Sequence, residues 1–209
     1  MRLFDFNRAP NPRRARMFIA EKGISIEKVT VDLYAMEQLR PEFLAVNPAG
    51  TVPVLETDEG VYLTETVAIA SYLESLHPEP PLMGTTGIDK AQVLMWNNIV
   101  EQQGMAAIAE VLRNWSPGFA NRAFPGTVDY AQMPELIERG RQRMTQFFDL
   151  IENRLKDRRF LAADSYTLAD ISLLAITEFA SWVRVNPLRG RPALAAWHEA
   201  ASARPSAQA

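Results

Sequence analysis

A carboxylate between two hydroxyl side chains is the first group in this sequence that could do chemistry. It belongs to Glu65, in the triplet Thr64-Glu65-Thr66, which follows a short apolar run and comes directly before a helical pattern. At the start of a helix, free backbone amides and the Thr66 hydroxyl can hold a carboxylate, while Glu65 can pair with an ammonium group. The triplet therefore suits recognition of an amino acid zwitterion. The alternative is that Thr64 or Thr66 only caps the helix.

A second candidate is a backbone position beside a proline. Pro53 opens an otherwise central strand in the segment Asn47-Pro48-Ala49-Gly50-Thr51-Val52-Pro53-Val54-Leu55, and proline donates no hydrogen bond to a sheet. With a cis Val52–Pro53 bond, the backbone groups of Val52 are free to pair with a peptide laid alongside as an extra strand. An edge strand with a trans proline is the alternative.

Positive charge at a helix start is the third candidate. Asn11 as N-cap and Pro12 as first helical residue predict a helix that ends at Gly23, and its first turn holds Arg13, Arg14 and Arg16. Cations there oppose the helix dipole. Either solvent and carboxylates such as Glu21 offset that cost, or a bound anion does.

One further motif is interpreted as structural. Thr167-Leu168-Ala169-Asp170 has the spacing of a capping box, with Asp in place of the usual Glu. We expect it to start a core helix and to direct folding. Asp170 is not expected to be catalytic.

The elements that must position these groups alternate between strand and helix patterns in the first part of the chain. Residues 1–77 predict an α/β unit with a mixed sheet, residues 78–88 a linker rich in proline and glycine, and residues 89–209 only helices. Strands are expected over 2–6, 24–31, 52–56 and 61–63, with a short helix over 41–46 and another from about 68. The later helices are expected over 89–115, 134–155, 168–183 and 192–201.

Composition limits the chemistry further. The chain has 209 residues, 47% of them hydrophobic, a formal charge of -3, two histidines (His77 and His198) and no cysteine. Disulfides, thiolate metal sites and catalysis by a protein thiol are thereby excluded, and no metal site is expected. The charge gives no case for nucleic acid, and no apolar run is long enough to cross a bilayer. We expect a cytoplasmic protein whose reactive nucleophile comes from a bound cofactor or substrate.

Together these segments resemble the cytosolic glutathione S-transferase family over nearly the whole chain. The resemblance rests on the order and spacing of several motifs. They lie at residues 9–16 and 20–24, 41–44 and 47–55, 64–69 and 72–73, and 167–172. It implies a thioredoxin-like glutathione-binding domain followed by an all-helical domain, and a homodimer with the active site beside the subunit boundary.

The resemblance also assigns residues to each part of glutathione. Val52, before Pro53, would pair through its backbone with the cysteinyl part, and Glu65 and Thr66 would bind the γ-glutamyl end. Thr51 and the segment from Gln38 to Arg40 lie where family members contact the glycyl end.

The chain departs from the family at the residue that activates the thiol. Ala9 stands at the position of the catalytic Ser, the end of the first strand does not fit the Tyr class, and no cysteine is present. The sequence is most similar to an atypical subgroup in which the helix N-terminus and groups of the helical domain share this task. Asn11, as a donor to the sulfur, and Ser116, with Asn114 as a second candidate to orient a water, are the expected catalytic residues.

The implied activity is conjugation of the glutathione thiolate to small apolar electrophiles, as in detoxification. Trp115 and Phe119, with Phe124 and Trp182, are expected to line the electrophile pocket. A non-catalytic glutathione-binding or regulatory protein is the main alternative, favoured by Ala9. A glutathione-dependent isomerase fits less well, because that class carries a Ser-rich motif at residues 9–12, and a peroxidase remains open because the same thiolate would serve.

Overall fold

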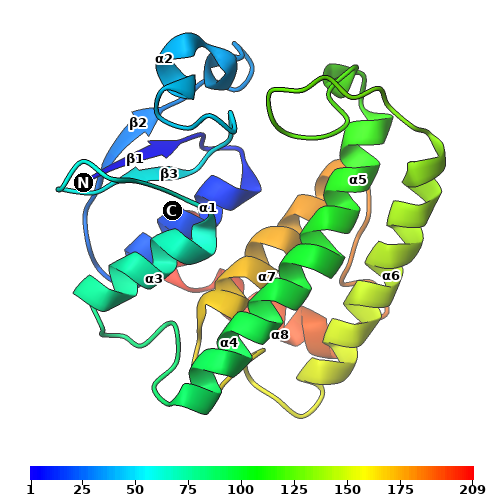
Figure 1. The fold of residues 1–209 in the computed structure, drawn as a ribbon. Coiled ribbons are helices and arrows are strands. Elements are labelled where there is room, and N and C mark those ends of the chain that lie inside the picture. The colour runs from blue at the N-terminus through cyan, green and yellow to red at the C-terminus, as the bar shows by residue number, and fades with distance from the viewer.

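A four-stranded mixed sheet forms the first part of the computed structural model, which describes residues 1–209 (Figure 1). Its strands are β1 (Arg2–Asp5), β2 (Glu27–Thr30), β3 (Val54–Glu56) and β4 (Tyr62–Thr64), in the order β2-β1-β3-β4. β1 is parallel to β2 and antiparallel to β3, and β4 is antiparallel to β3. The predicted α/β domain with a mixed sheet is confirmed.

The two faces of the sheet are covered by different elements. Leu3 of β1 joins the main core, which α1 (Pro10–Glu21) and α3 (Thr66–Leu76) complete on one face. The next residue, Phe4, joins a small cluster with Phe43 of α2 (Pro41–Leu44) on the other face. Successive side chains of a strand point to opposite faces, so this alternation fixes which helices lie on which side.

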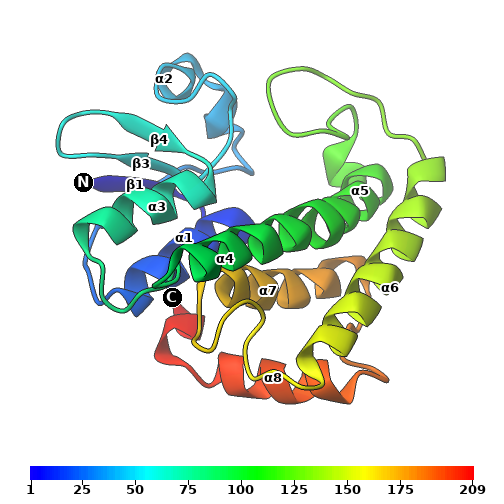
Figure 2. The same cartoon turned by 60° about the horizontal axis from the view of Figure 1, so that its bottom comes forward.

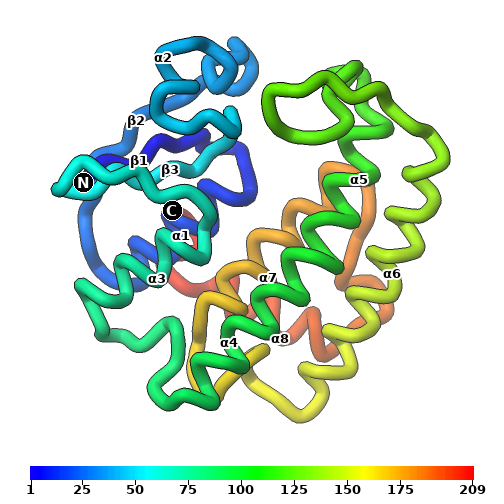
Figure 3. Tube along the Cα trace, viewed as in Figure 1, coloured from blue at the N-terminus to red at the C-terminus, as the bar shows by residue number.

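The second part is entirely helical (Figure 2). Its elements are α4 (Gly87–Ile99), η2 (Val100–Met105), α5 (Ala106–Trp115), η3 (Pro117–Phe119), α6 (Glu135–Leu155), α7 (Leu168–Phe179), η4 (Ala180–Val183), α8 (Pro192–Ser202) and η5 (Pro205–Gln208). The long helix expected over 89–115 starts at Gly87 and has a π-helical stretch, η2, in its middle. A long loop joins α5 to α6 and lies close to the α2 side of the first domain (Figure 3). None of the helices combines the length and the apolarity that a membrane span requires.

The core helix α7 begins as the capping box predicts. Thr167 and Asp170 form the capping box, in which the side chain of each accepts a hydrogen bond from the backbone N–H of the other. Because 11 residues of α7 are buried, this helix is the centre of the helical domain. Asp170 also accepts hydrogen bonds from the Leu161 amide at 2.8 Å and from the Trp197 indole at 3.1 Å. Complete burial outweighs these bonds and raises the pKa of Asp170 to about 6.

The two domains share one apolar core. It includes Leu3, Phe18 and Ile69 from the first domain together with Ile108 and Leu174 from the second. α1 packs directly on α7. The N-terminus of α1 is therefore held between the sheet and the helical domain.

The helix cap expected at Asn11 is wrong, and the capping role considered as an alternative for Thr64 or Thr66 is not found. α1 begins two residues earlier than expected, with Ala9 as N-cap and Pro10 as its first residue, because Pro10 itself suits the first position of a helix. Asn11 therefore makes no capping bond. α3 has Glu65 as its N-cap and no side-chain cap, so neither Thr64 nor Thr66 has the simple capping role.

Candidate active site

The segments singled out in the first domain meet where the strands of the sheet end, at the edge that runs across the strands. Phe4 pairs with Val54, and Val54 pairs with Thr64. The end of β1, the start of β3 and the end of β4 therefore lie side by side. Because each strand continues into a candidate segment at this edge, the start of α1, the Val52–Pro53 bond and Glu65 are brought together.

The backbone of Val52 is free to bind a ligand. The Val52–Pro53 bond is cis, which decides between the two alternatives that the sequence left open, and neither the N–H nor the C=O of Val52 has a hydrogen-bond partner. The preceding loop is fixed by Asn47, whose amide nitrogen donates to the Thr51 carbonyl at 2.8 Å and to the Thr51 hydroxyl at 3.1 Å. Free backbone groups on a fixed loop suit pairing with an extended peptide.

Glu65 holds an uncommon backbone conformation at the start of α3. Its φ is +66°, in the region that non-glycine residues rarely occupy, and its exposed side chain makes no ion pair. The first helical hydrogen bond of α3 runs from Ile69 N–H to Glu65 C=O, so the earlier amides are not used by the helix. A carboxylate without a partner beside unused amides suits an ammonium and a carboxylate on one ligand.

Asn11 is the main source of hydrogen-bond donors at the start of α1. Pro10 and Pro12 have no N–H, and the Ala9 N–H donates to the Phe6 carbonyl at 3.0 Å. The Asn11 N–H has no partner. Arg14 Nη1 donates to Asn11 Oδ1 at 3.0 Å, and because arginine only donates, the amide oxygen of Asn11 must face it. The NH2 group of Asn11 is thus directed away from Arg14 and can donate to a ligand.

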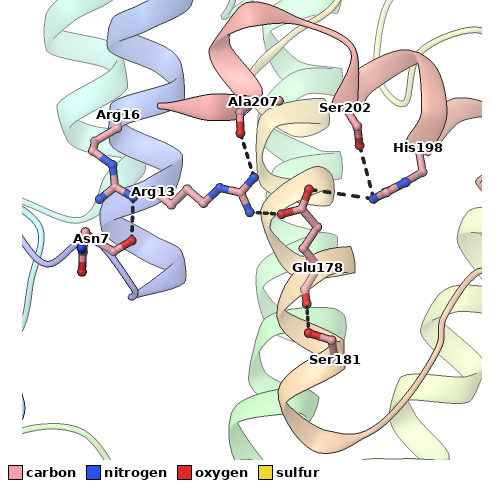
Figure 4. Close-up of polar contacts among 8 residues, drawn as sticks. All are labelled: Asn7, Arg13, Arg16, Glu178, Ser181, His198, Ser202 and Ala207. Atoms are coloured by element: carbon pink, nitrogen blue, oxygen red, sulfur yellow. Dashed lines mark hydrogen bonds and ion pairs between the residues drawn. The ribbon is translucent and has the colours of Figure 1, made fainter.

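The arginines of α1 are compensated within the protein, so the bound anion considered for them is not needed. Arg13 pairs with Glu178 of α7 and donates to the Ala207 carbonyl at 3.1 Å (Figure 4). Arg14 pairs with Glu101, and Arg16 with Asp5. Glu21, the partner expected from the sequence, instead pairs with Arg204. These ion pairs tie α1 to the sheet and to the helical domain.

The residues expected near the glycyl end lie around Gly50. A Cβ on Gly50 would come 3.2 Å from the Gln38 carbonyl, and the φ of Gly50 is +63°, so only glycine fits there without strain. The Gln38 side chain is 5% exposed, and its Oε1 has no hydrogen-bond partner. Arg40 lies on the surface, with Nη1 3.3 Å from Glu37 Oε1, and lines a hollow of about 290 Å³ on the α2 side of the sheet. Gln38 therefore has a buried acceptor without a partner, whereas Arg40 is exposed and pairs with Glu37.

On the helical side, the Ser116 hydroxyl has no hydrogen-bond partner within the protein, whereas the Asn114 side chain has two. Ser116 follows the last residue of α5, and its hydroxyl makes no hydrogen bond. Asn114 is buried, donates to the Glu110 carbonyl at 2.8 Å and accepts from the Met133 amide at 2.8 Å. The expectation that Asn114 orients a water is wrong, because its amide fastens the loop between α5 and α6.

The four residues expected in the electrophile pocket differ in exposure, and Phe124 and Trp182 are both exposed. Trp115 is 39% exposed, and the Arg184 guanidinium carbon lies 5.1 Å from the centre of its ring. Phe119 is half-buried beneath Arg113, at 4.7 Å. Burial lowers the pKa of Arg113 to about 10, and the charge of Arg122 adds to this effect.

Sequence reasoning missed several residues at this edge. Arg8 lies between Tyr34 of the first domain and Trp182 of the second, 5.9 Å from the centre of each ring. Arg122, in the loop between α5 and α6, lies against Met36 of the first domain. Only folding brings these distant segments together, so no local pattern announces them.

The fold and the geometry of the site define a class of protein in which a thioredoxin-like domain, with free backbone groups beside a cis proline, packs against a helical domain. The family model described as "Glutathione S-transferase, N-terminal domain" matches residues 3–81, and "Glutathione S-transferase, C-terminal domain" matches residues 115–205. The chain belongs to the glutathione S-transferase family.

Similar proteins agree with this assignment. The chain is 32% identical to "Glutathione S-transferase 2" of Saccharomyces cerevisiae, over 99% of this chain and 87% of that protein. The crystal structure of a glutathione S-transferase domain-containing protein of Marinobacter aquaeolei matches with a TM-score of 0.90 and 30% identity, covering 99% of both chains. That of Gtt2 from Saccharomyces cerevisiae matches with a TM-score of 0.89 and 31% identity, covering 100% of this chain and 99% of the other.

Proposed function

We propose that this protein conjugates glutathione to small electrophiles, and that it does so without a catalytic Tyr, Ser or Cys. The observation that carries the proposal is the pair of free Asn11 donors at the same edge of the sheet as the free Val52 backbone. A peptide paired with Val52 would bring its side chain to the start of α1. A sulfur placed there faces the donors of Asn11.

Each part of glutathione has suitable residues. Glu65 would bind the γ-glutamyl ammonium, and the amides at the start of α3 with the Thr66 hydroxyl would bind its carboxylate. Val52 would bind the backbone of the cysteinyl residue. Gln38, Arg40 and Thr51 would contact the glycyl end, where the unpartnered Oε1 of Gln38 can accept a hydrogen bond.

Asn11 would stabilise the thiolate. A free thiol has a pKa near 8.5, so only a few per cent is ionised at neutral pH. A hydrogen bond to a charged group contributes about 1.5–3 kcal/mol, and each pKa unit corresponds to about 1.4 kcal/mol. Two donors from Asn11 are therefore enough to lower the thiol pKa by at least one unit. Ser116 would hold a water at the sulfur from the helical side.

The setting of this activity is also proposed. We expect a cytoplasmic homodimer with a detoxifying role, as the family resemblance implies. Trp115 and Phe119 would form part of the electrophile pocket. Isomerase or peroxidase chemistry would use the same thiolate.

A non-catalytic glutathione-binding protein is the second candidate, because Ala9 leaves the start of α1 without a hydroxyl. Three variants separate the two functions: Glu65→Ala, Asn11→Ala and Ser116→Ala. For a transferase, Glu65→Ala weakens glutathione binding, while Asn11→Ala and Ser116→Ala lower kcat with glutathione still bound. Unchanged turnover in both of the latter refutes the catalytic assignment. Glutathione binding without turnover across varied electrophiles supports the binding protein.

A further inference from the structure

The loop between α5 and α6 contacts the segments of the first domain that are proposed to hold the glycyl end of glutathione (Figure 3). A Cβ on Gly50 would lie 3.4 Å from Thr127 Cγ2. Arg122, in the same loop, lies against Met36, two residues before Gln38. The helical domain therefore supplies side chains next to this part of the proposed site.

Two hydrogen-bond donors meet at a weak acceptor beside Gln38. The Met36 sulfur is the one acceptor within the protein for the Arg122 guanidinium, and Gln38 Nε2 lies 3.8 Å from the same sulfur. A thioether accepts hydrogen bonds weakly, whereas a carboxylate accepts them strongly from a guanidinium. The buried Oε1 of Gln38 has no donor at all. The group of three side chains therefore lacks one strong acceptor and one donor.

Arg113 adds a second positive charge that has no carboxylate partner. Its Nη1 donates to the Arg122 carbonyl at 2.8 Å, which fixes the backbone at that residue. Neither arginine lies within ion-pair distance of a carboxylate. Burial lowers the pKa of Arg113 to about 10, and the nearby charge of Arg122 lowers it further. A bound anion would offset the repulsion between these two groups.

We propose that Arg122, from the helical domain, binds the terminal carboxylate of the thiol co-substrate. The Gln38 amide would complete the contact, because its Oε1 can accept from the glycyl N–H and its Nε2 can donate to the carboxylate. This inference rests on the proposed function and specifies its class of thiol, a peptide that ends in a free carboxylate one residue beyond the cysteine. It adds the second domain to a subsite that the sequence placed in the first domain alone.

Arg40, the cation expected at this end from the sequence, is less suited to the carboxylate. It is exposed, pairs with Glu37 and lines the hollow on the α2 side of the sheet. Arg122 is half-buried and has no such pair. An exposed charge pair contributes little, because water and salt screen it, so Arg122 should supply the larger part of the binding.

Glutathione and glutathione amide, in which a carboxamide replaces the glycyl carboxylate, test this contact. The two peptides share the thiol, the γ-glutamyl end and the length, and differ in charge at the glycyl end. The measurement is the Kd of each reduced peptide by isothermal titration calorimetry at one fixed ionic strength. We expect the wild type to bind glutathione about tenfold or more tightly than the amide, the range of a hydrogen bond to a charged group.

Variants of Arg122 assign this preference to one side chain. Arg122→Gln removes most of the preference, and Arg122→Lys, which keeps the charge but not the planar pair of donors, retains part of it. Arg159→Gln is the matched control, because Arg159 is exposed, lies 5.2 Å from the Phe160 ring and belongs to the loop between α6 and α7. It leaves the preference unchanged. The ratio of the two Kd values is compared because a general loss of structure weakens both peptides alike.

Two outcomes overturn the inference while the proposed function stands. One is equal binding of both peptides to the wild type, and the other is a wild-type preference that survives in Arg122→Gln. The second result is expected if Arg122 only packs the loop against Met36, since the variant then lowers stability without changing the ratio. If the wild type binds neither peptide, the proposed function itself is refuted, and the inference with it.

Discussion

Removing Glu101 is expected to cost more stability than removing Arg14, although the two side chains form one ion pair. Arg14 is 2% exposed, and besides Glu101 it donates to Ser172 Oγ at 2.8 Å, to Asn11 Oδ1 at 3.0 Å and to Asn97 Oδ1 at 3.1 Å. Burial lowers its pKa, and Glu101 opposes this effect. Glu101 itself is 25% exposed, so it can reach water if Arg14 is absent.

The two substitutions leave different groups without an ion-pair partner. Glu101→Met leaves a buried cation with only neutral acceptors, and breaking a buried pair in this way costs about 3–5 kcal/mol. We expect the lower end of that range, about 3 kcal/mol, because Glu101 is partly exposed and three neutral acceptors remain. Arg14→Met leaves no buried charge, and Ser172 still donates to Asn97 at 2.6 Å, so about 1–2 kcal/mol is expected.

Urea unfolding at one fixed protein concentration measures both losses, with a shift in Tm of about 2–4 °C per kcal/mol as a second reading. The double variant should cost less than the sum of the single variants. Arg14→Met is also expected to affect the proposed thiolate site. Without Arg14 the Asn11 amide is free to rotate, which should raise the thiol pKa of bound glutathione. The reasoning is refuted if Arg14→Met costs as much as Glu101→Met, or if the two losses add.

Three further predictions test the ion pairs, packing and hydrogen bonds that hold the elements around the site. Burial opposes ionisation of Glu21, but hydrogen bonds from Arg204 and Ser206 outweigh it and lower the pKa of Glu21 from 4.5. The stabilisation is therefore present above about pH 4.5 and lost as the pH falls below it, so acid unfolding curves of wild type and Glu21→Gln should converge at low pH. Gly104→Ala should cost about 1–3 kcal/mol in urea unfolding, because its Cβ would lie 2.6 Å from the Phe147 ring; an unchanged midpoint would contradict this packing. Asn114→Ala should speed proteolysis of the loop between α5 and α6 while α5 stays folded, and an unchanged cleavage rate would show that Asn114 does not fasten it.

Local patterns predicted most of the first domain. In the helical domain, the capping box at Asp170 also follows from a few adjacent residues, because helix starts depend on close neighbours. The residues around Pro53 marked the position but left open whether its peptide bond is cis or trans. The start of α1 was misplaced for an equally local reason, since both Pro10 and Pro12 suit a first turn and the sequence does not say which one begins the helix.

The parts that depend on distant segments could not be predicted. Arg13 pairs with Glu178, which is 165 residues away, and no pattern selects that partner over Glu21. The Arg8, Tyr34 and Trp182 group joins three segments across both domains. Such groups depend on how α1 packs against α7, and α7 against η4, which is a property of the folded core.

Stabilisation of the bound glutathione thiolate by Asn11 is the central step of the proposed function. The direct measurement is a titration of the purified protein with glutathione over a pH series, following the ultraviolet absorbance of the thiolate in wild type and Asn11→Ala. We expect the bound thiolate in the wild type to persist at least about one unit below the free thiol's pKa of about 8.5, and Asn11→Ala to remove most of that shift. Bound glutathione that ionises like the free thiol, or no binding at all, would contradict the account.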